Sequence, residues 1–407
     1  MELTITIINW ISALIMFGIF GAWLYLLIYT IKSFKQSPIL ESFDRSTVNE
    51  FQKVSVILPA RNEEKYIGKC LDSLLKQDYS NFEIITINDS SSDRTEEIMR
   101  QYAVQSSNII VINADSKPDG WVGKNWACYQ GYLKASGEVF LFTDADTVHS
   151  PSVISMAIRH LEQQNLDALT AIPKLLCMDI WTKITLPVLS TFLHTRFSPL
   201  RVNDPKTKTG YFFGSFFVIT RSSYETVGTH RSVRHELIED GALGGKVKQA
   251  KFRMKMVRGE NHIDAIWARD IKTLWHGLRR LMIPLYSQNR KKVSLMTIAL
   301  FFLLFEPFLL LPYSLSFLLN WAANDLFAQI LFDINVVTIV LIILTNLIHS
   351  KFSLFQNPIY ALASPLGCAI VSLSFISSVV GARKTGAINW SDRQYTINEK
   401  QHPVNSY

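Results

Sequence analysis

Two aspartates, Asp144 and Asp146, stand one residue apart directly after the apolar run Val139–Thr143. Carboxylate oxygens are ligands that Mg²⁺ and Mn²⁺ prefer, and these cations commonly keep water and substrate phosphates in the rest of their shell. Two carboxylates at the end of a buried strand can therefore hold a divalent cation and the diphosphate of a nucleotide. The same pair is also common in solvated turns, so by itself it favours a functional site only weakly.

Two further polar clusters follow apolar runs that have the character of strands. Residues 60–64 (ARNEE) follow Val54–Leu58, which Pro59 is expected to end, and residues 89–93 (DSSSD) follow Phe82–Asn88. In parallel α/β sheets, ligands bind beyond the carboxyl ends of the strands, so the clusters are expected at one edge of a sheet. The chain has neither a GxGxxG nor a Walker loop, which excludes a glycine cradle for phosphate.

Strand-like and helix-like segments alternate around these clusters. Residues 65–76 have their apolar side chains at helical spacing, residues 90–97 offer capping chemistry, and residues 124–135 read as a third helix. Residues 109–113 and 139–143 supply two more strands. This order predicts an α/β fold with a parallel, doubly wound sheet.

The composition points to a membrane protein. Of the 407 residues, 18% are charged and 48% are hydrophobic, which excludes disordered and collagen-like classes. The apolar segments are long enough to cross a bilayer near both ends of the chain. The expected organisation is a transmembrane anchor at 1–33, a globular domain at 50–262, a basic amphipathic interfacial segment at 263–292, membrane segments at 293–382 and a tail at 383–407.

The charges around the first apolar segment predict its orientation. Lys32, Lys35 and Arg45 follow it and only Glu2 precedes it, so the globular domain is expected in the cytoplasm of a multi-pass protein of the cell membrane. A cleaved signal peptide is disfavoured, because the run is too long and no small-residue cleavage site follows. In the cytoplasm the cysteines are expected to be reduced core residues: Cys70, Cys128, Cys177 and Cys368.

The C-terminal segments raise a question of parity. Three full crossings after the domain would place Arg383 and Lys384 outside, against the positive-inside tendency. We therefore expect two full C-terminal crossings and an internal tail. The segment at 293–320, which contains Glu306, Pro307 and Pro312, is the candidate for a re-entrant or interfacial element.

Four motifs occur in succession along the globular domain. They are VSVILPARNEE (54–64), EIITINDSSSDRT (83–95), DGWVGKNWACYQG (119–131) and GEVFLFTDADT (137–147). Together they resemble the family 2 glycosyltransferases, whose fold is the Rossmann-like GT-A fold, over residues 50–260. The resemblance implies an inverting glycosyltransferase that moves a single sugar from a nucleotide-diphosphate sugar.

The resemblance also implies roles for individual residues. Pro59 to Glu63 would wall the pocket of the nucleotide base, Asp89 would bond to the base, and Lys124 would lie near the diphosphate. The donor-binding residues expected in this way are Pro59, Arg61, Glu63, Asp89, Lys124, Asp144 and Arg393. Asp146 would bind the Mg²⁺ or Mn²⁺, and Asp144 would contact the ribose or the metal.

Residues 235–243 (HELIEDGAL) resemble the (E/D)D segment of the family. The resemblance implies that Asp240 is the catalytic base that takes the proton of the acceptor. The alternative is that Glu239 and Asp240 begin a helix and complement its positive end. Of the two acids, Glu239 is the better candidate for a structural role.

Residues 246–292 contain 13 Lys and Arg but only three acids, Glu260, Asp264 and Asp270. Apolar residues interleave these cations, and an apolar span follows. This combination predicts an interfacial segment against anionic headgroups rather than a nucleic-acid site, with some cations able to close over a diphosphate. A lipid-like acceptor from the membrane is therefore expected.

Two apolar segments upstream each have two interpretations. Residues 180–200 are typical of a core helix or of a membrane-facing element. An acceptor wall or part of the core is expected of Tyr211, Phe212, Phe213, Gly214 and Phe216.

Residues 388–395 resemble a W-x-G-R-x-Y tail of membrane members of the family that glycosylate carotenoid acids, hopanoids or ceramides. Asp392 stands at the usual glycine, and Arg393 would contact a diphosphate or a headgroup.

Other functions stay open. A processive polysaccharide synthase would carry Q-x-x-R-W, whereas residues 288–292 read QNRKK without the Trp. A polyprenyl-phosphate glycosyltransferase would suit the basic segment. A membrane-tethered regulator that binds sugar nucleotide without turnover is the alternative outside enzymes.

Overall fold

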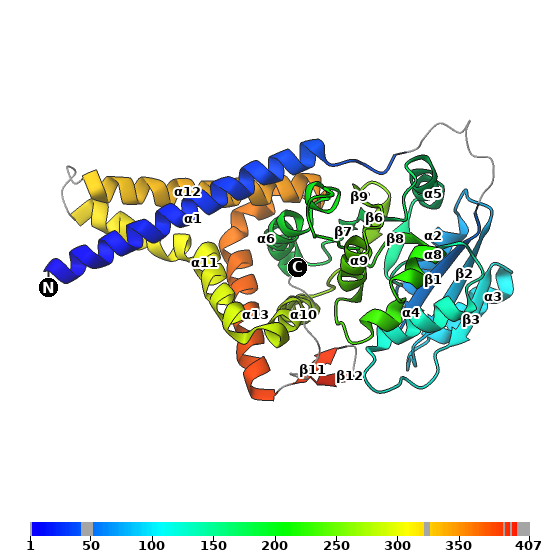
Figure 1. The fold of residues 1–407 in the computed structure, drawn as a ribbon. Helices are drawn as coiled ribbons and strands as arrows, with labels where there is room; N and C mark the ends of the chain where they lie inside the picture. The colour runs from blue at the N-terminus through cyan, green and yellow to red at the C-terminus, as the bar shows by residue number, and fades with distance from the viewer. Residues whose placement is uncertain (1, 42–51, 321–325, 386, 391–392, 397–407) are drawn as a thin grey trace.

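The computed structural model describes residues 2–41, 52–320, 326–385, 387–390 and 393–396. A globular α/β domain lies at one end and a set of long helices at the other (Figure 1).

The main sheet of the domain has seven strands in the order β3-β2-β1-β4-β8-β6-β9. The first four in this order are parallel, but β8 runs antiparallel to both β4 and β6. Because β6 is thus again parallel to β4, and β9 is parallel to β6, six of the seven strands share one direction, and the predicted parallel sheet is confirmed except for the inserted strand β8. The strands are β1 (Val54–Ala60), β2 (Phe82–Asn88), β3 (Ile109–Asn113), β4 (Val139–Phe142), β6 (Ala168–Ile172), β8 (Phe217–Thr220) and β9 (Met254–Arg258).

Pro59 does not end β1, as expected from the sequence, but lies inside it. The pairing of β1 with β4 stops at Ile57, whereas the register with β2 continues to Ala60. The missing N–H of Pro59 therefore breaks no ladder bond with β4. The bounds of β2 and β3 agree with the predicted ones.

Helices cover both faces of the sheet, so successive residues of β1 enter two different cores. Val56 and Leu58 belong to one core and Ile57 to the other. The first core packs against α2 (Ile67–Leu75), α3 (Thr95–Gln105) and α5 (Val153–Gln163), and the second against α4 (Gly123–Lys134), α8 (Arg221–Thr226) and α9 (Glu239–Gln249).

A second sheet of three short strands adjoins Asp146. Its order is β5-β10-β7, with β5 at Thr147–His149, β7 at Lys174–Leu175 and β10 at Ile263–Ala265. Because β10 pairs with both neighbours, the domain extends past residue 262, where the sequence suggested that it ends.

Four helices are long and apolar enough to cross a membrane: Trp10–Gln36, Arg290–Ser316, Leu326–Phe352 and Pro358–Gly381. They lie within α1 (Glu2–Gln36), α11 (Arg290–Asn320), α12 (Leu326–Phe352), and η3 (Pro358–Ala363) with α13 (Ser364–Thr385). Two helices of the intervening chain, α6 (Ile180–Arg196) and α10 (Ile271–Gln288), share one apolar core with them. The apolar segment at 180–200 is thus a core helix, but of the helical region and not of the domain.

Arg258, at the end of β9, joins the domain to two of the long helices. Its guanidinium donates to the carbonyl oxygens of Phe34 in α1 and Phe352 in α12, at 3.3 Å each. The C-terminal ends of α1 and α12 therefore both lie at the domain, and the two helices run side by side in the same direction (Figure 1).

Candidate functional site

Three side chains from separate parts of the chain converge on Gly214. A Cβ atom at this glycine would lie 2.8 Å from Oδ2 of Asp240, 3.2 Å from Nζ of Lys124 and 3.4 Å from Oδ2 of Asp144. Lys124 lies in the first turn of α4, Asp144 follows β4, and Asp240 lies in the first turn of α9. The absence of a side chain at Gly214 is therefore what leaves space between the three groups.

Lys124 bridges two carboxylates. Its Nζ lies 2.7 Å from Oδ1 of Asp144 and 2.7 Å from Oε1 of Glu239, and the Glu239 side chain is only 5% exposed. Burial lowers the pKa of Lys124, but the charges of Asp144 and Glu239 outweigh it and raise this pKa well above its usual value. Glu239 thus neutralises a buried cation, which fits the structural role expected for it.

Asp240 is held by backbone amides on both oxygens. Gly214 donates to Oδ2 at 2.8 Å and Gly241 to Oδ1 at 2.7 Å. Burial, followed by the nearby charge of Glu239, raises the pKa of Asp240 to about 7, against the opposing effect of Lys124. An oriented carboxylate with a pKa near neutrality can accept a proton from a substrate more readily than an ordinary aspartate. Because Asp240 is also in the first turn of α9, both interpretations of this residue fit its position.

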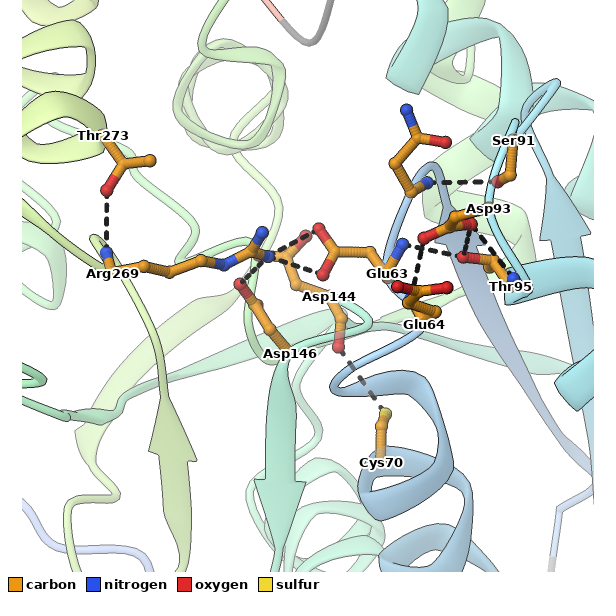
Figure 2. A network of polar contacts seen from close by, with 11 residues as sticks. Glu63, Glu64, Cys70, Ser91, Asp93, Thr95, Asp144, Asp146, Arg269 and Thr273 are labelled. Atoms are coloured by element: carbon orange, nitrogen blue, oxygen red, sulfur yellow. Dashed lines mark hydrogen bonds and ion pairs between the residues drawn. The ribbon is translucent and has the colours of Figure 1, made fainter.

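Asp146 belongs to a second polar group, which Figure 2 shows. Nη2 of Arg269 lies 2.7 and 2.5 Å from the two oxygens of Glu63 and 3.4 Å from Oδ2 of Asp146. Burial, then the charges of Asp144 and Glu63, raises the pKa of Asp146 to about 7. Burial likewise raises the pKa of Glu63, although Arg269 opposes it.

The loops after β1 and β2 are tied together beside this group. Nη1 of Arg61 donates to the carbonyl oxygens of Asp89 and Ser90 at 2.7 and 2.9 Å. The left-handed backbone of Asn62 and Ser90, with φ near 57° and 56°, lets both loops turn back sharply. Arg61 therefore fixes the main chain at Asp89, a residue that is 5% exposed.

The chemistry of Asp144 and Asp146 fits a divalent cation. Within the described ranges, no group of three or more His, Cys, Asp and Glu side chains could hold a metal by itself. Two hard oxygen ligands are nevertheless enough for Mg²⁺ or Mn²⁺ when substrate phosphates and water fill the other positions. Lys124 and Arg269 are the two cations that pair with the acidic side chains here, and they are outnumbered by their four partners, so the excess of carboxyl groups also favours a cation. The four partners are Glu63, Asp144, Asp146 and Glu239.

An aromatic wall lies beside Asp240. The ring of Tyr211 packs against Gly241, where a Cβ would be only 2.6 Å from it, and stacks on Phe197 with centroids 4.1 Å apart. Phe212 and Phe216 are fully buried in the domain cores. Of the predicted aromatic segment, Tyr211 therefore faces the site, whereas Phe212 and Phe216 are core.

The predicted residues thus form one region at the carboxyl ends of β1, β2 and β4, except Arg393. Arg393 begins β12 (Arg393–Thr396), which pairs with β11 (Ala387–Trp390), but its side chain lies outside the described residues. Arg269 does not stand out in the sequence among the 13 cations of the basic segment, because sequence spacing says nothing about which of them reaches Glu63.

The four cysteines are free.

The sequence matches a known family over the region that holds most of these residues. Residues 55–228 match the family described as glycosyl transferase family 2.

Curated relatives extend the similarity beyond this region. The chain is 24% identical over 368 residues to a 4,4'-diaponeurosporenoate glycosyltransferase of Staphylococcus aureus (strain bovine RF122 / ET3-1), covering 86% of this chain and 90% of the relative. It is 27% identical over 265 residues to a protein of the same name from Staphylococcus haemolyticus (strain JCSC1435), covering 64% of this chain and 69% of the relative.

A solved structure shares the fold. It is the mannosyltransferase PcManGT from Pyrobaculum calidifontis in complex with GDP-Man and Mn²⁺, with a TM-score of 0.53 and 15% identity, covering 92% of this chain and 100% of the other. The GT-A fold expected from the sequence motifs is confirmed by this likeness.

Proposed function

We propose that this chain, whose residues 55–228 match glycosyl transferase family 2, is a glycosyltransferase that transfers a single sugar from a nucleoside-diphosphate sugar to a lipid-like acceptor and inverts the anomeric carbon. The observation that supports this best is the convergence of Lys124, Asp144 and Asp240 on Gly214. Lys124 would offer a cation for phosphate, Asp144 a ligand for the metal or the ribose, and Asp240 an acceptor of a proton. All three groups lie within reach of one small substrate group at Gly214.

The donor would bind on the side of Lys124 and Asp144. Lys124 would place its ammonium against the departing diphosphate. Asp144 and Asp146 would hold Mg²⁺ or Mn²⁺, and such a cation, when bound, stabilises negative charge on a leaving phosphate. The mannosyltransferase of the same fold was solved with GDP-Man and Mn²⁺, which supports these ligand classes as the first to test.

Asp240 would act from the acceptor side. Its carboxylate would take the proton of an acceptor hydroxyl while that oxygen bonds to the anomeric carbon and the bond from this carbon to the diphosphate breaks. A single displacement of this kind inverts the anomeric centre. The two backbone amides on Asp240 keep the carboxylate oriented for this step.

The acceptor is proposed to arrive from the membrane. The relatives are named for 4,4'-diaponeurosporenoate, which supports a long apolar acceptor here too. The aromatic wall of Tyr211 and Phe197 is next to Asp240 and begins where α6 ends. It would therefore guide an apolar chain from the helical region to the base.

The directions of the helices support a membrane placement. Arg258 contacts the C-terminal ends of both α1 and α12, so both helices would cross the membrane toward the side on which the domain lies. The helix that precedes α12 and packs against it, α11, would cross in the opposite direction, away from the domain. The structure thus favours α11 as a full crossing, although Pro307 and Pro312 lie inside it, in place of the re-entrant segment expected from the sequence. With the domain in the cytoplasm, the N-terminus would be outside.

The remaining apolar helix, α13, would then stay on the domain side. It packs against α6, α10 and α11, and in Figure 1 it begins and ends nearer to the domain than the far ends of α1, α11 and α12. Leu366, Leu373 and Val380, spaced seven residues apart, form an exposed apolar stripe that would face lipid. This arrangement keeps two full C-terminal crossings and an internal tail.

The proposal is tested with the purified full-length chain in detergent. The chain is incubated with membrane lipid extract, Mn²⁺ and a panel of nucleoside-diphosphate sugars, and both nucleoside diphosphate release and the mass of labelled lipid are measured. A lipid carrying one sugar is the expected product. Asp146→Asn is expected to abolish metal-dependent turnover, whereas the matched change Asp264→Asn, at a partly exposed pair with Lys174, is expected to leave it intact.

The other outcomes identify the alternatives. A sugar linked to lipid phosphate would identify a polyprenyl-phosphate glycosyltransferase, and a ladder of products with many sugars would identify a processive synthase. Binding of a sugar nucleotide without turnover under every condition would contradict the proposal and favour a regulator.

A further inference from the structure

The guanidinium of Arg269 lies against two carboxylates of the proposed donor site, Glu63 and Asp146. It contacts both oxygens of Glu63 and one oxygen of Asp146. It also lies over the ring of Tyr66, 4.6 Å from the ring centre. Figure 2 shows that it reaches this position from the side opposite to Glu63. A positive group thus already lies against one of the two oxygens, Oδ2, that Asp146 could offer to a metal.

The electrostatics explain why a cation occupies this position. Asp146 is close enough to Asp144 and Glu63 for their charges to raise its pKa. Lys124 is already committed to Asp144 and Glu239. Without Arg269, Glu63 and Asp146 would be two neighbouring carboxylates that form no ion pair with any of the described residues. Arg269 therefore provides the neutralisation that a divalent cation would otherwise supply.

The backbone of Arg269 is fixed, but its side chain is partly exposed. Its N–H donates to Oγ1 of Thr273 at 2.8 Å, and Asp270 accepts from the amide of Thr273 at 2.8 Å, so the start of α10 is firmly capped. The Arg269 side chain is 35% exposed. A change of partners would therefore require rotation of this long side chain and no movement of the main chain.

We propose that Arg269 pairs with Glu63 and Asp146 until a donor binds and moves from these two carboxylates to the diphosphate when the donor and its cation bind. The identity of the diphosphate rests on the proposed function. The competition between Arg269 and a cation for Asp146 does not, because it depends only on the observed contacts. Arg269 thus weakens the binding of a bare cation and strengthens the binding of a nucleoside diphosphate.

Two binding measurements on the full-length chain in detergent test this without turnover. The first follows free Mn²⁺ by electron paramagnetic resonance in the absence of nucleotide. Arg269→Met is expected to tighten Mn²⁺ binding about tenfold, the change expected if Arg269 leaves the carboxylates for only about a tenth of the time. Lys272→Met removes an equal charge from an exposed position three residues away and is expected to leave the Mn²⁺ affinity nearly unchanged.

The second measurement is the calorimetric affinity for UDP and for GDP, each with saturating Mn²⁺. Arg269→Met is expected to weaken binding of the nucleoside diphosphate that the wild type prefers by about tenfold or more, because a charge-assisted contact is lost. Arg269→Lys keeps the charge but replaces the guanidinium, whose Nη2 contacts both carboxylates, with a more compact ammonium, so it is expected to lie between wild type and Arg269→Met in both measurements.

Opposite shifts in the two affinities distinguish this role from a purely structural one, which would weaken both. The inference is overturned if Arg269→Met and Lys272→Met bind Mn²⁺ equally, or if Arg269→Met binds it more weakly than wild type. If the wild type binds neither UDP nor GDP, the proposed function fails, and the Mn²⁺ comparison still decides whether Arg269 shields Asp146.

Discussion

The amide of Gly214 donates a 2.8 Å hydrogen bond to Oδ2 of Asp240. This contact joins the loop before β8 to the start of α9 and orients the carboxylate proposed as the base. It also means that residue 214 serves twice, through its N–H as a donor and through its missing side chain as free space.

Replacing Gly214 by alanine tests the second role. The new Cβ would lie 2.8 Å from Asp240, so this carboxylate must shift. We expect kcat to fall about 10- to 100-fold, because displaced catalytic groups lose their alignment, while stability falls by only about 1 kcal/mol. Kinetics and thermal unfolding measure the two effects.

The matched control is Gly68→Ala in α2, where the nearest atom to the new Cβ is 3.5 Å away. It is expected to keep full activity and to gain about 0.5–1 kcal/mol of stability, as alanine favours helix over glycine. Equal activity of the two variants would refute the role of Gly214.

Lys124→Met tests whether Lys124 acts on substrate as well as on its partners. The change leaves Asp144 and the buried Glu239 without their shared cation, so we expect a stability loss of about 3–5 kcal/mol together with loss of turnover. Adding Glu239→Gln is expected to restore much of the stability, measured by thermal unfolding, but none of the activity.

For comparison, Lys174→Met removes a cation from a more exposed pair and is expected to cost about 0–1 kcal/mol. If the double variant regained activity along with stability, Lys124 would be structural only.

Asp240→Asn distinguishes two classes of acceptor. A hydroxyl acceptor must lose a proton, so kcat is expected to fall about 10²–10⁴-fold. A carboxylate acceptor is already deprotonated, and the loss is then expected to be clearly smaller. Turnover by wild type and variant on matched alcohol and acid lipids measures the difference, and an equal loss on both would rule out this interpretation of the base.

The pH dependence of activity and stability should run in opposite directions. With the pKa of Asp240 at about 7 instead of 3.8, turnover of a hydroxyl acceptor is expected to rise as the pH rises through about 7. Between pH 3.8 and about 7, the Asp240 carboxyl is protonated in the folded chain but ionised in the unfolded chain. The folded chain therefore binds more protons, and the contribution of Asp240 to the free energy of unfolding falls as the pH rises through this range.

Profiles of kcat/KM and of the unfolding temperature between pH 5 and 9 provide the measurement. The unfolding temperature of Asp240→Asn is expected to fall less steeply than that of wild type as the pH rises to about 7, because the variant lacks the group that takes up the proton. A wild-type activity profile that falls through pH 7 would contradict the assignment of Asp240 as base.

The topology can be tested by cysteine labelling of intact cells with a reagent that does not cross membranes. Ser406→Cys, in the tail, is expected to stay unlabelled. Ala322→Cys, between α11 and α12, is expected to be labelled because α11 crosses outward. Labelling of Ser406→Cys would place the tail outside, and protection of Ala322→Cys would restore the re-entrant interpretation of residues 293–320.

The sequence alone determined the first four strands of the main sheet and the polar residues that follow three of them. Apolar runs and their spacing are local properties, so β2 and β3 begin and end where the pattern predicts, and the long apolar helices follow from composition. Asp144 and Asp146 are placed by the strand that precedes them, and the ordered motifs made the family recognisable.

Only the tertiary structure decided which of these residues meet. Arg269 and Glu63 are 206 positions apart, and no periodicity singles out Arg269 among its basic neighbours. The antiparallel β8, the common direction of α1 and α12, and the sharing of Lys124 by Asp144 and Glu239 are likewise long-range. They depend on how burial and charge balance are satisfied across the whole molecule, and local sequence spacing carries no record of that balance.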